Sequence, residues 1–114
     1  MTDNLMAVLD TYTVLTKDTD LFYLDMPLNT SGLWFADRQT DNIRTDHKDY
    51  DVYYRGKDKA KCVKNIEYLK KSIDDMTECS INNQIFNLKV LYQWDFLEKD
   101  SEGYYVFANT FRII

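Results

Sequence analysis

The sequence predicts a single α+β domain, residues 1–114, with a mostly antiparallel sheet of four or five strands and two helices packed on one face. One central segment repeats apolar residues at helical spacing, and later segments alternate apolar and polar residues as strands do. The chain is 45% hydrophobic and free of low-complexity stretches. A folded chain of this mass buries about two-thirds of the surface that its unfolded form exposes, so we expect one core without linkers.

The first half of the chain is predicted to form one helix and three strands. Leu5, Leu9 and Tyr12 recur at spacings of four and three residues, which indicates a helix over 3–16. Short aromatic and aliphatic runs, separated by turn-forming residues, indicate strands rather than helices. These strands cover residues 21–24, 33–36 and 50–55. The polar stretch 37–49 is expected to be a loop available for function.

The second half is predicted to form a helix and a closing β-hairpin. A helix over 58–76 is indicated by apolar residues spaced four and three apart: Cys62, Ile66, Leu69, Ile73 and Met76. Alternation of apolar and polar residues over 88–97 indicates a strand. The turn-rich segment 98–103 then leads to a last strand, Tyr104 to Ile113.

Seventeen aromatic residues exceed what one sheet face and two helices are expected to bury. Exposed contiguous apolar surface on a small protein most often marks an interface, and Tyr, Trp and Phe are enriched there. We therefore expect one sheet face to form a homo-oligomer interface. Its expected residues are Tyr53, Arg55, Tyr105, Phe107, Phe111 and Ile113. The alternative is that the termini or segment 77–87 fold back over this face.

Residues for catalysis or metal binding are scarce. The lone His47 lies in the charged loop without a sequence-local nucleophile, and Cys62 lies on the apolar stripe of the second helix. Two cysteines seventeen positions apart and one histidine do not make a closed tetrahedral metal set. Glycine-rich phosphate motifs are also missing from the sequence. We expect a protein that is not an enzyme and that uses no metal or cofactor.

Charge and hydropathy limit the classes of binding partner that we expect. The net charge of −5 repels phosphate, so nonspecific nucleic-acid binding is not expected. No run approaches the roughly 20 apolar residues that span a bilayer, and the acidic start is unlike a secretory signal. We expect synthesis in the cytoplasm and no membrane association.

The motif Tyr50-Asp-Val-Tyr-Tyr-Arg55-Gly-Lys-Asp58, followed by the helical stripe KCVKNIEYLKKSIDDM, resembles the tail terminator proteins of long-tailed phages, often filed as minor capsid proteins. The closing hairpin, with Lys99–Gly103 as its turn and Phe107–Ile113 in its final strand, is also similar to theirs. The resemblance implies a hexameric ring that stops tail-tube polymerisation and provides the head-joining surface. It implies a place in the virion tail or neck, tail-tube and head–tail connector proteins as partners, and a lumen through which DNA passes.

Within this interpretation, the polar loop is expected to dock onto the tube or connector through Arg38, Asp41, Arg44 and His47. A second hypothesis, from a different class, is a small acidic binding module that blocks a host protein with the same apolar face.

Overall fold

The computed structural model describes residues 4–38, 47–76 and 78–114. It confirms an α+β fold in which two helices accompany a mostly antiparallel sheet. The elements are α1 (Asn4–Tyr12), β1 (Leu21–Tyr23), β2 (Gly32–Asp37), β3 (Lys48–Gly56), α2 (Lys59–Asp74), β4 (Cys79–Ile81), β5 (Gln84–Phe86), β6 (Leu88–Val90), β7 (Asp95–Lys99) and β8 (Tyr105–Ile113).

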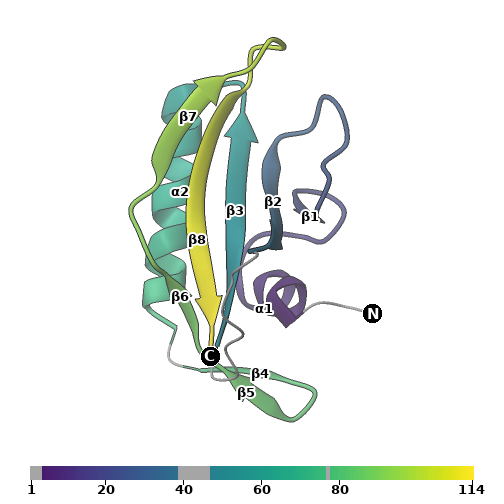
Figure 1. The fold of residues 1–114 in the computed structure, drawn as a ribbon, viewed down its shortest axis with the longest axis vertical. Helices are drawn as coiled ribbons and strands as arrows, with labels where there is room; N and C mark the ends of the chain where they lie inside the picture. Colours follow the sequence, from purple (N-terminus) through teal and green to yellow (C-terminus); the bar gives the residue numbers. More distant parts are fainter. Residues whose placement is uncertain (1–3, 39–46, 77) are drawn as a thin grey trace.

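The main sheet has six strands in the order β1-β2-β3-β8-β6, and β7 also pairs with β8 (Figure 1). Its centre is the long antiparallel pair of β3 and β8, which runs from Lys48 opposite Ile113 to Gly56 opposite Tyr105. Only the pairing of β1 with β2 is parallel among the described strands. The two edges of the sheet are therefore β1 on one side and β6 with β7 on the other.

The sheet contains more strands than predicted because the expected strand over 88–97 is interrupted. Between β6 and β7 the Asn109 side chain occupies the place of a strand neighbour. Its Oδ1 accepts a hydrogen bond from the Tyr92 backbone N–H at 3.3 Å, and its Nδ2 donates to the Tyr92 carbonyl at 2.9 Å. The amide thus satisfies backbone groups that the regular ladder leaves without partners. A buried polar side chain on β8 splits one predicted strand into two.

Both helices contribute to one core on the same side of the sheet. The N-terminus of α2 is capped by Asp58, whose Oδ1 accepts from the Lys61 N–H at 3.1 Å. The predicted stripe of α2 is buried at Cys62, Ile66, Leu69 and Ile73. The last two join α1 and the sheet in a cluster that includes Leu5, Val8, Leu9, Phe35, Tyr50, Val52 and Phe111. Neither helix in the described ranges is long and apolar enough to cross a membrane.

Segment 77–87 contains a small hairpin, β4–β5, where the sequence suggests only a polar stretch. Its turn residues Asn82 and Asn83 both have positive φ, at 49° and 66°, as a tight hairpin turn requires. Tyr12 holds the hairpin to α1, because its hydroxyl accepts from the Ser80 N–H at 2.8 Å and donates to the Ser80 carbonyl at 3.2 Å. Cys79 joins the core beside the helices, so this segment does not cover the second sheet face.

Candidate interaction surface

The six residues expected at the interface lie on two different sides of the sheet in the structure. Phe107, Phe111 and Ile113 are 4%, 0% and 6% exposed and belong to the core beneath the helices. Tyr105 is half-buried and lies on the same side, because side chains two apart on a strand share a face. The expectation that these β8 residues face a partner is corrected: the alternation is right, but this side faces the helices.

Tyr53 and Arg55 lie on the opposite side. We call this side the open face, and it carries Trp34 and Ala36 from β2, Asp51, Tyr53 and Arg55 from β3, and Val106, Ala108 and Thr110 from β8. The assignment follows from the register, because Trp34 is directly opposite Tyr53, and Tyr53 is opposite Ala108. Both described helices pack on the other side. The open face is therefore the side on which a partner can approach the sheet directly.

An aromatic and cationic group occupies one half of the open face. The rings of Trp34 and Tyr53 stack with their centroids 5.1 Å apart and their planes 22° from parallel. The Arg55 guanidinium carbon lies 4.9 Å from the centre of the Tyr104 ring and 5.9 Å from that of Trp34, within cation–π range. Trp34 and Tyr53 remain partly exposed, whereas Tyr104 is buried.

Backbone carbonyls of the loop between β1 and β2 hold Arg55 in position. Its Nε donates to the Thr30 carbonyl at 2.8 Å, and its Nη2 donates to the Pro27 carbonyl at 2.7 Å. Two charge-assisted hydrogen bonds hold the planar guanidinium in one orientation. This surface is therefore organised before any partner binds.

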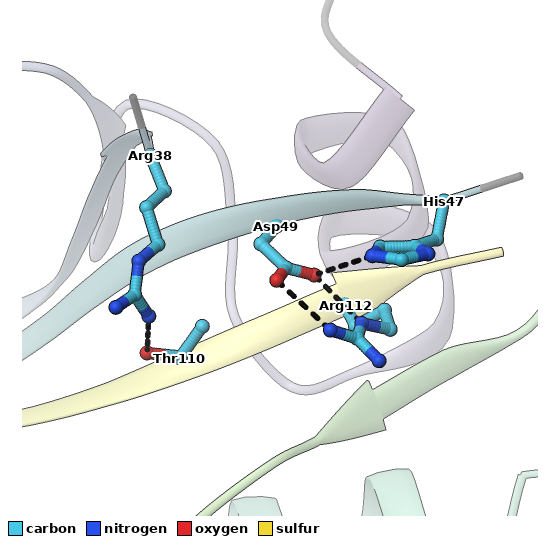
Figure 2. A network of polar contacts seen from close by, with 5 residues as sticks. All are labelled: Arg38, His47, Asp49, Thr110 and Arg112. Carbon is cyan, nitrogen blue, oxygen red and sulfur yellow. Dashed lines mark hydrogen bonds and ion pairs between the residues drawn. The ribbon is translucent and has the colours of Figure 1, made fainter. Parts of the chain in front are cut away.

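A polar network lies at the other end of β3 and β8 (Figure 2). Arg112 makes a bidentate ion pair with Asp49, with Nε–Oδ1 and Nη2–Oδ2 distances of 2.8 and 3.0 Å. The His47 Nε2 lies 4.0 Å from Asp49 Oδ1. The hydrogen bonds from Arg112 lower the pKa of the Asp49 carboxyl below its ordinary 3.8, although partial burial opposes the shift.

The expected docking loop is only partly within the described ranges. Arg38 is exposed, and its Nη1 donates to the Thr110 hydroxyl at 3.2 Å (Figure 2). His47 is half-buried beside Asp49. Asp41 and Arg44 lie outside the described residues. The structure therefore places two of the four residues beside the open face, with Arg38 reaching the β8 side chain Thr110.

Between the aromatic group and the polar network, the open face has a shallow concavity of about 330 Å³. Its lining includes Arg38, Asp51, Tyr53 and Asp95, so charges of both signs border an aromatic ring. Such a mixture of donors, acceptors and ring edges suits a protein surface, whose own groups are similarly mixed. The concavity joins the two ends of the open face into one candidate interaction surface.

The environment of the two cysteines does not favour nucleophilic chemistry. Cys62 and Cys79 are free and buried, and burial raises the pKa of both thiols, which disfavours the nucleophilic thiolate. The described part of the chain contains no group of three or more His, Cys, Asp and Glu residues that could hold a metal ion.

Trp34, Tyr104 and the Asp49–Arg112 pair are absent from the residues expected from sequence. Alternation along 33–36 places Trp34 on the side opposite to Leu33 and Phe35, but it does not say which of the two sides meets the helices. The ion pair has no local signal, because its members are 63 positions apart.

No protein-family model, curated protein or solved structure matches the chain. The similarity to tail terminators thus rests on the sequence motifs alone.

Proposed function

We propose that this chain is a virion assembly protein of the tail terminator kind, which forms a ring on the end of a tail tube and provides the surface that joins the head. The proposal is supported by the resemblance at residues 50–58, the α2 stripe and the closing hairpin. The observation that carries it in the structure is the open face, where Trp34, Tyr53 and Arg55 form a partly exposed group on β2 and β3.

These residue types are those that dominate binding energy at protein interfaces, where Trp, Tyr and Arg are over-represented. Because Arg55 is already held by the Thr30 and Pro27 carbonyls, binding costs little additional side-chain ordering. A sheet face also provides a broad, stiff contact area. These properties favour a lasting structural contact with another protein.

The charge of the chain is compatible with DNA passage through a ring. A net charge of −5 per subunit gives no general attraction for phosphate, so DNA would not be gripped along its backbone. We propose that the tail-tube protein and the head–tail connector are the partners, with no membrane and no cofactor involved.

Size-exclusion chromatography with light scattering tests the proposal. We expect assembly to a closed oligomer of the 13.6 kDa subunit, either alone or on addition of tail-tube protein. The second arm is essential because some ring proteins assemble only on their tube. A strict monomer at tens of micromolar in both arms would contradict the proposal.

The open face itself is tested by Trp34→Ser combined with Tyr53→Ser. We expect a folded protein by circular dichroism that binds tail-tube or connector protein at least tenfold more weakly, as loss of two aromatic contacts predicts. Tyr68→Ser is the matched control, because Tyr68 is 59% exposed on α2, away from the open face. Unchanged binding by the double variant, or an equal loss of binding in the control, would contradict the proposal that the open face binds the partner.

The alternative proposal is an inhibitory module whose open face binds a host protein. Affinity capture with a host lysate and with purified tail-tube protein separates the two. A host enzyme as sole partner, lost with Tyr53→Ser, would favour the inhibitor.

A further inference from the structure

Strand β7 forms an edge of the main sheet. Among the described strands it pairs only with β8, on the side of β8 away from β3, so no strand lies on its outer side (Figure 1). All of its residues, Asp95–Lys99, are exposed. An edge strand presents unpaired backbone N–H and C=O groups, to which another strand can bind.

The two faces of β7 differ in charge. The register with β8 places Asp95 and Glu98 on the open face. Phe96 and Lys99 lie on the side where the helices pack, which we call the helix side, and Lys99 is opposite Tyr105. On the helix side, β7 is therefore apolar and cationic rather than acidic.

Two lysines lie over neighbouring aromatic rings on this helix side. The Nζ of Lys59, the first residue of α2, is 4.4 Å from the centre of the Phe96 ring. The Lys99 Nζ is 5.2 Å from the centre of the Tyr105 ring, and the two ring centroids are 6.1 Å apart. Neither lysine forms an ion pair with another described residue. Charge complementarity therefore favours a carboxylate here.

An apolar groove lies next to the two lysines, between α2 and the segment that leads into β7. Its volume is about 340 Å³, and its lining consists of Val63, Ile66, Trp94 and Phe107 together with Glu67, Lys70 and Gln93. Lys70 is paired with Asp74 at 3.0 Å. The Phe107 ring lies 5.5 Å from that of Phe96, so the groove continues to the aromatic rings beneath the lysines. Such a groove suits an apolar side chain.

We propose that the groove and the outer edge of β7 bind an extended segment of a partner protein, which adds a strand to the sheet. In strand addition, backbone hydrogen bonds give affinity, and pockets for alternate side chains give specificity. One apolar side chain of the segment enters the groove, and a carboxylate two positions away contacts Lys59 and Lys99. A single strand can place both groups, because side chains at alternate positions point to the same face. The inference does not depend on the proposed ring, since it uses the side of the sheet opposite to the open face.

The structure of β7 also favours a matching segment over an arbitrary strand. The register shifts between Phe96 and Glu98, and such bulges, together with charged side chains, discourage nonspecific pairing at sheet edges. Regular backbone pairing beside β7 is therefore short. The groove and the two lysines must supply the rest of the binding, so the sequence of the partner segment decides whether it binds.

NMR titration of the isotope-labelled chain with a synthetic peptide tests this inference. The probe is acetyl-Thr-Glu-Thr-Leu-Thr-Glu-Thr-amide, which presents Leu between two Glu on one face in either strand orientation. We expect this peptide to shift the signals of the β7 amides and of the Trp94 indole N–H, and to slow hydrogen exchange along β7. The Trp34 indole signal, on the open face, should not move. A matched peptide with Lys in place of both Glu should bind about tenfold more weakly, because each exposed ion pair changes affinity by a few-fold.

Charge reversal at the two lysines provides a second arm of the experiment. Lys59→Glu with Lys99→Glu should reverse the preference, so that the Lys peptide binds more tightly than the Glu peptide. The control is Lys57→Glu with Lys61→Glu, which makes the same change in net charge. Lys57 and Lys61 line a separate cavity with Ser31, directly before β2, so the control should keep the preference for Glu. All four lysines are exposed, and both variants should stay folded by circular dichroism.

Three results would overturn the inference. The first is that neither peptide shifts the β7 amides at millimolar concentration, and the second is that both peptides bind equally well. The third is movement of the Trp34 signal in place of the Trp94 signal, which would assign the peptide to the open face. The titration uses neither tail-tube protein nor an assembled ring, so its failure is distinguishable from failure of the proposed function.

Discussion

Replacing Phe111 by Ala tests which side of β8 faces the core. Phe111 is 0% exposed, lies opposite Tyr50 on β3, and makes an edge-to-face contact with Trp94 at a centroid distance of 5.9 Å. Removal of a fully buried phenyl ring costs about 3–5 kcal/mol, from lost burial and the cavity left behind. Typical domains have a free energy of unfolding of about 5–15 kcal/mol, so this is a large share of the total.

The change is measured by urea unfolding followed with circular dichroism. For a chain of this size, a loss of 3–5 kcal/mol corresponds to a fall in Tm of about 10–20 °C. Phe111→Asp should prevent folding altogether, since it buries a charge without a partner. Ile114→Ala is the control, because Ile114 is 48% exposed one position past β8, and it should change stability by less than about 1 kcal/mol.

A different result would reverse the assignment of the two sheet faces. If Phe111→Ala unfolds with the same midpoint as the unaltered protein but fails to assemble, the phenyl ring contacts a partner rather than the core. The assignment of the two sheet faces would then be reversed, and Tyr53 and Arg55 would lose their place on the partner surface.

Two further substitutions test the polar contacts of β8. Asp49→Asn should lower the free energy of unfolding by about 1–3 kcal/mol near pH 7, since Arg112 loses a charged acceptor. The Asp49 pKa is depressed, so the stabilisation is fully present above the ordinary value of 3.8 and is lost as pH falls through the folded-state pKa; urea midpoints should therefore converge in strong acid. If the two proteins differ equally at pH 7 and in strong acid, the ion pair is not the cause. Asn109→Ala should cost about 1–3 kcal/mol and speed hydrogen exchange at Tyr92, because it removes both hydrogen bonds to that backbone. Unchanged hydrogen exchange at Tyr92 would mean that the Asn109 side chain does not stabilise the backbone between β6 and β7.

The elements whose signals are local could be predicted from the sequence. Helix α2 follows from four buried residues spaced by four and three, and the structure begins it directly after the Asp58 cap. The closing hairpin follows from alternation on both sides of a turn-rich segment, and β7 pairs with β8 around it. In both cases the residues that decide the structure lie within a few positions of one another.

The sidedness of the sheet could not be obtained in this way. Alternation along β8 separates Phe107 and Phe111 from Val106 and Ala108, but it does not say which set meets the helices. That choice depends on where the helices pack, which is a tertiary property. The same limit applies to the break at Tyr92, because it depends on Asn109 seventeen positions away.

The same distinction between local signals and tertiary contacts applies to the candidate interaction surface. Tyr53 and Arg55 could be predicted as surface residues of an aromatic strand, and the structure places them on the open face. Trp34 becomes their neighbour only through the register of β2 with β3. The contact of Arg55 with two loop carbonyls required the path of residues 24–31, which has no periodic pattern.

The central claim, a ring that caps a tail tube, is tested most directly by tube elongation. Tail-tube protein is polymerised with and without this chain, and tube lengths and ends are measured by electron microscopy. We expect tubes that stop growing and carry a ring at one end, and tubes that grow on when the Trp34→Ser/Tyr53→Ser double variant replaces the unaltered protein. Tubes of unchanged length with bare ends in the presence of excess unaltered protein would contradict it.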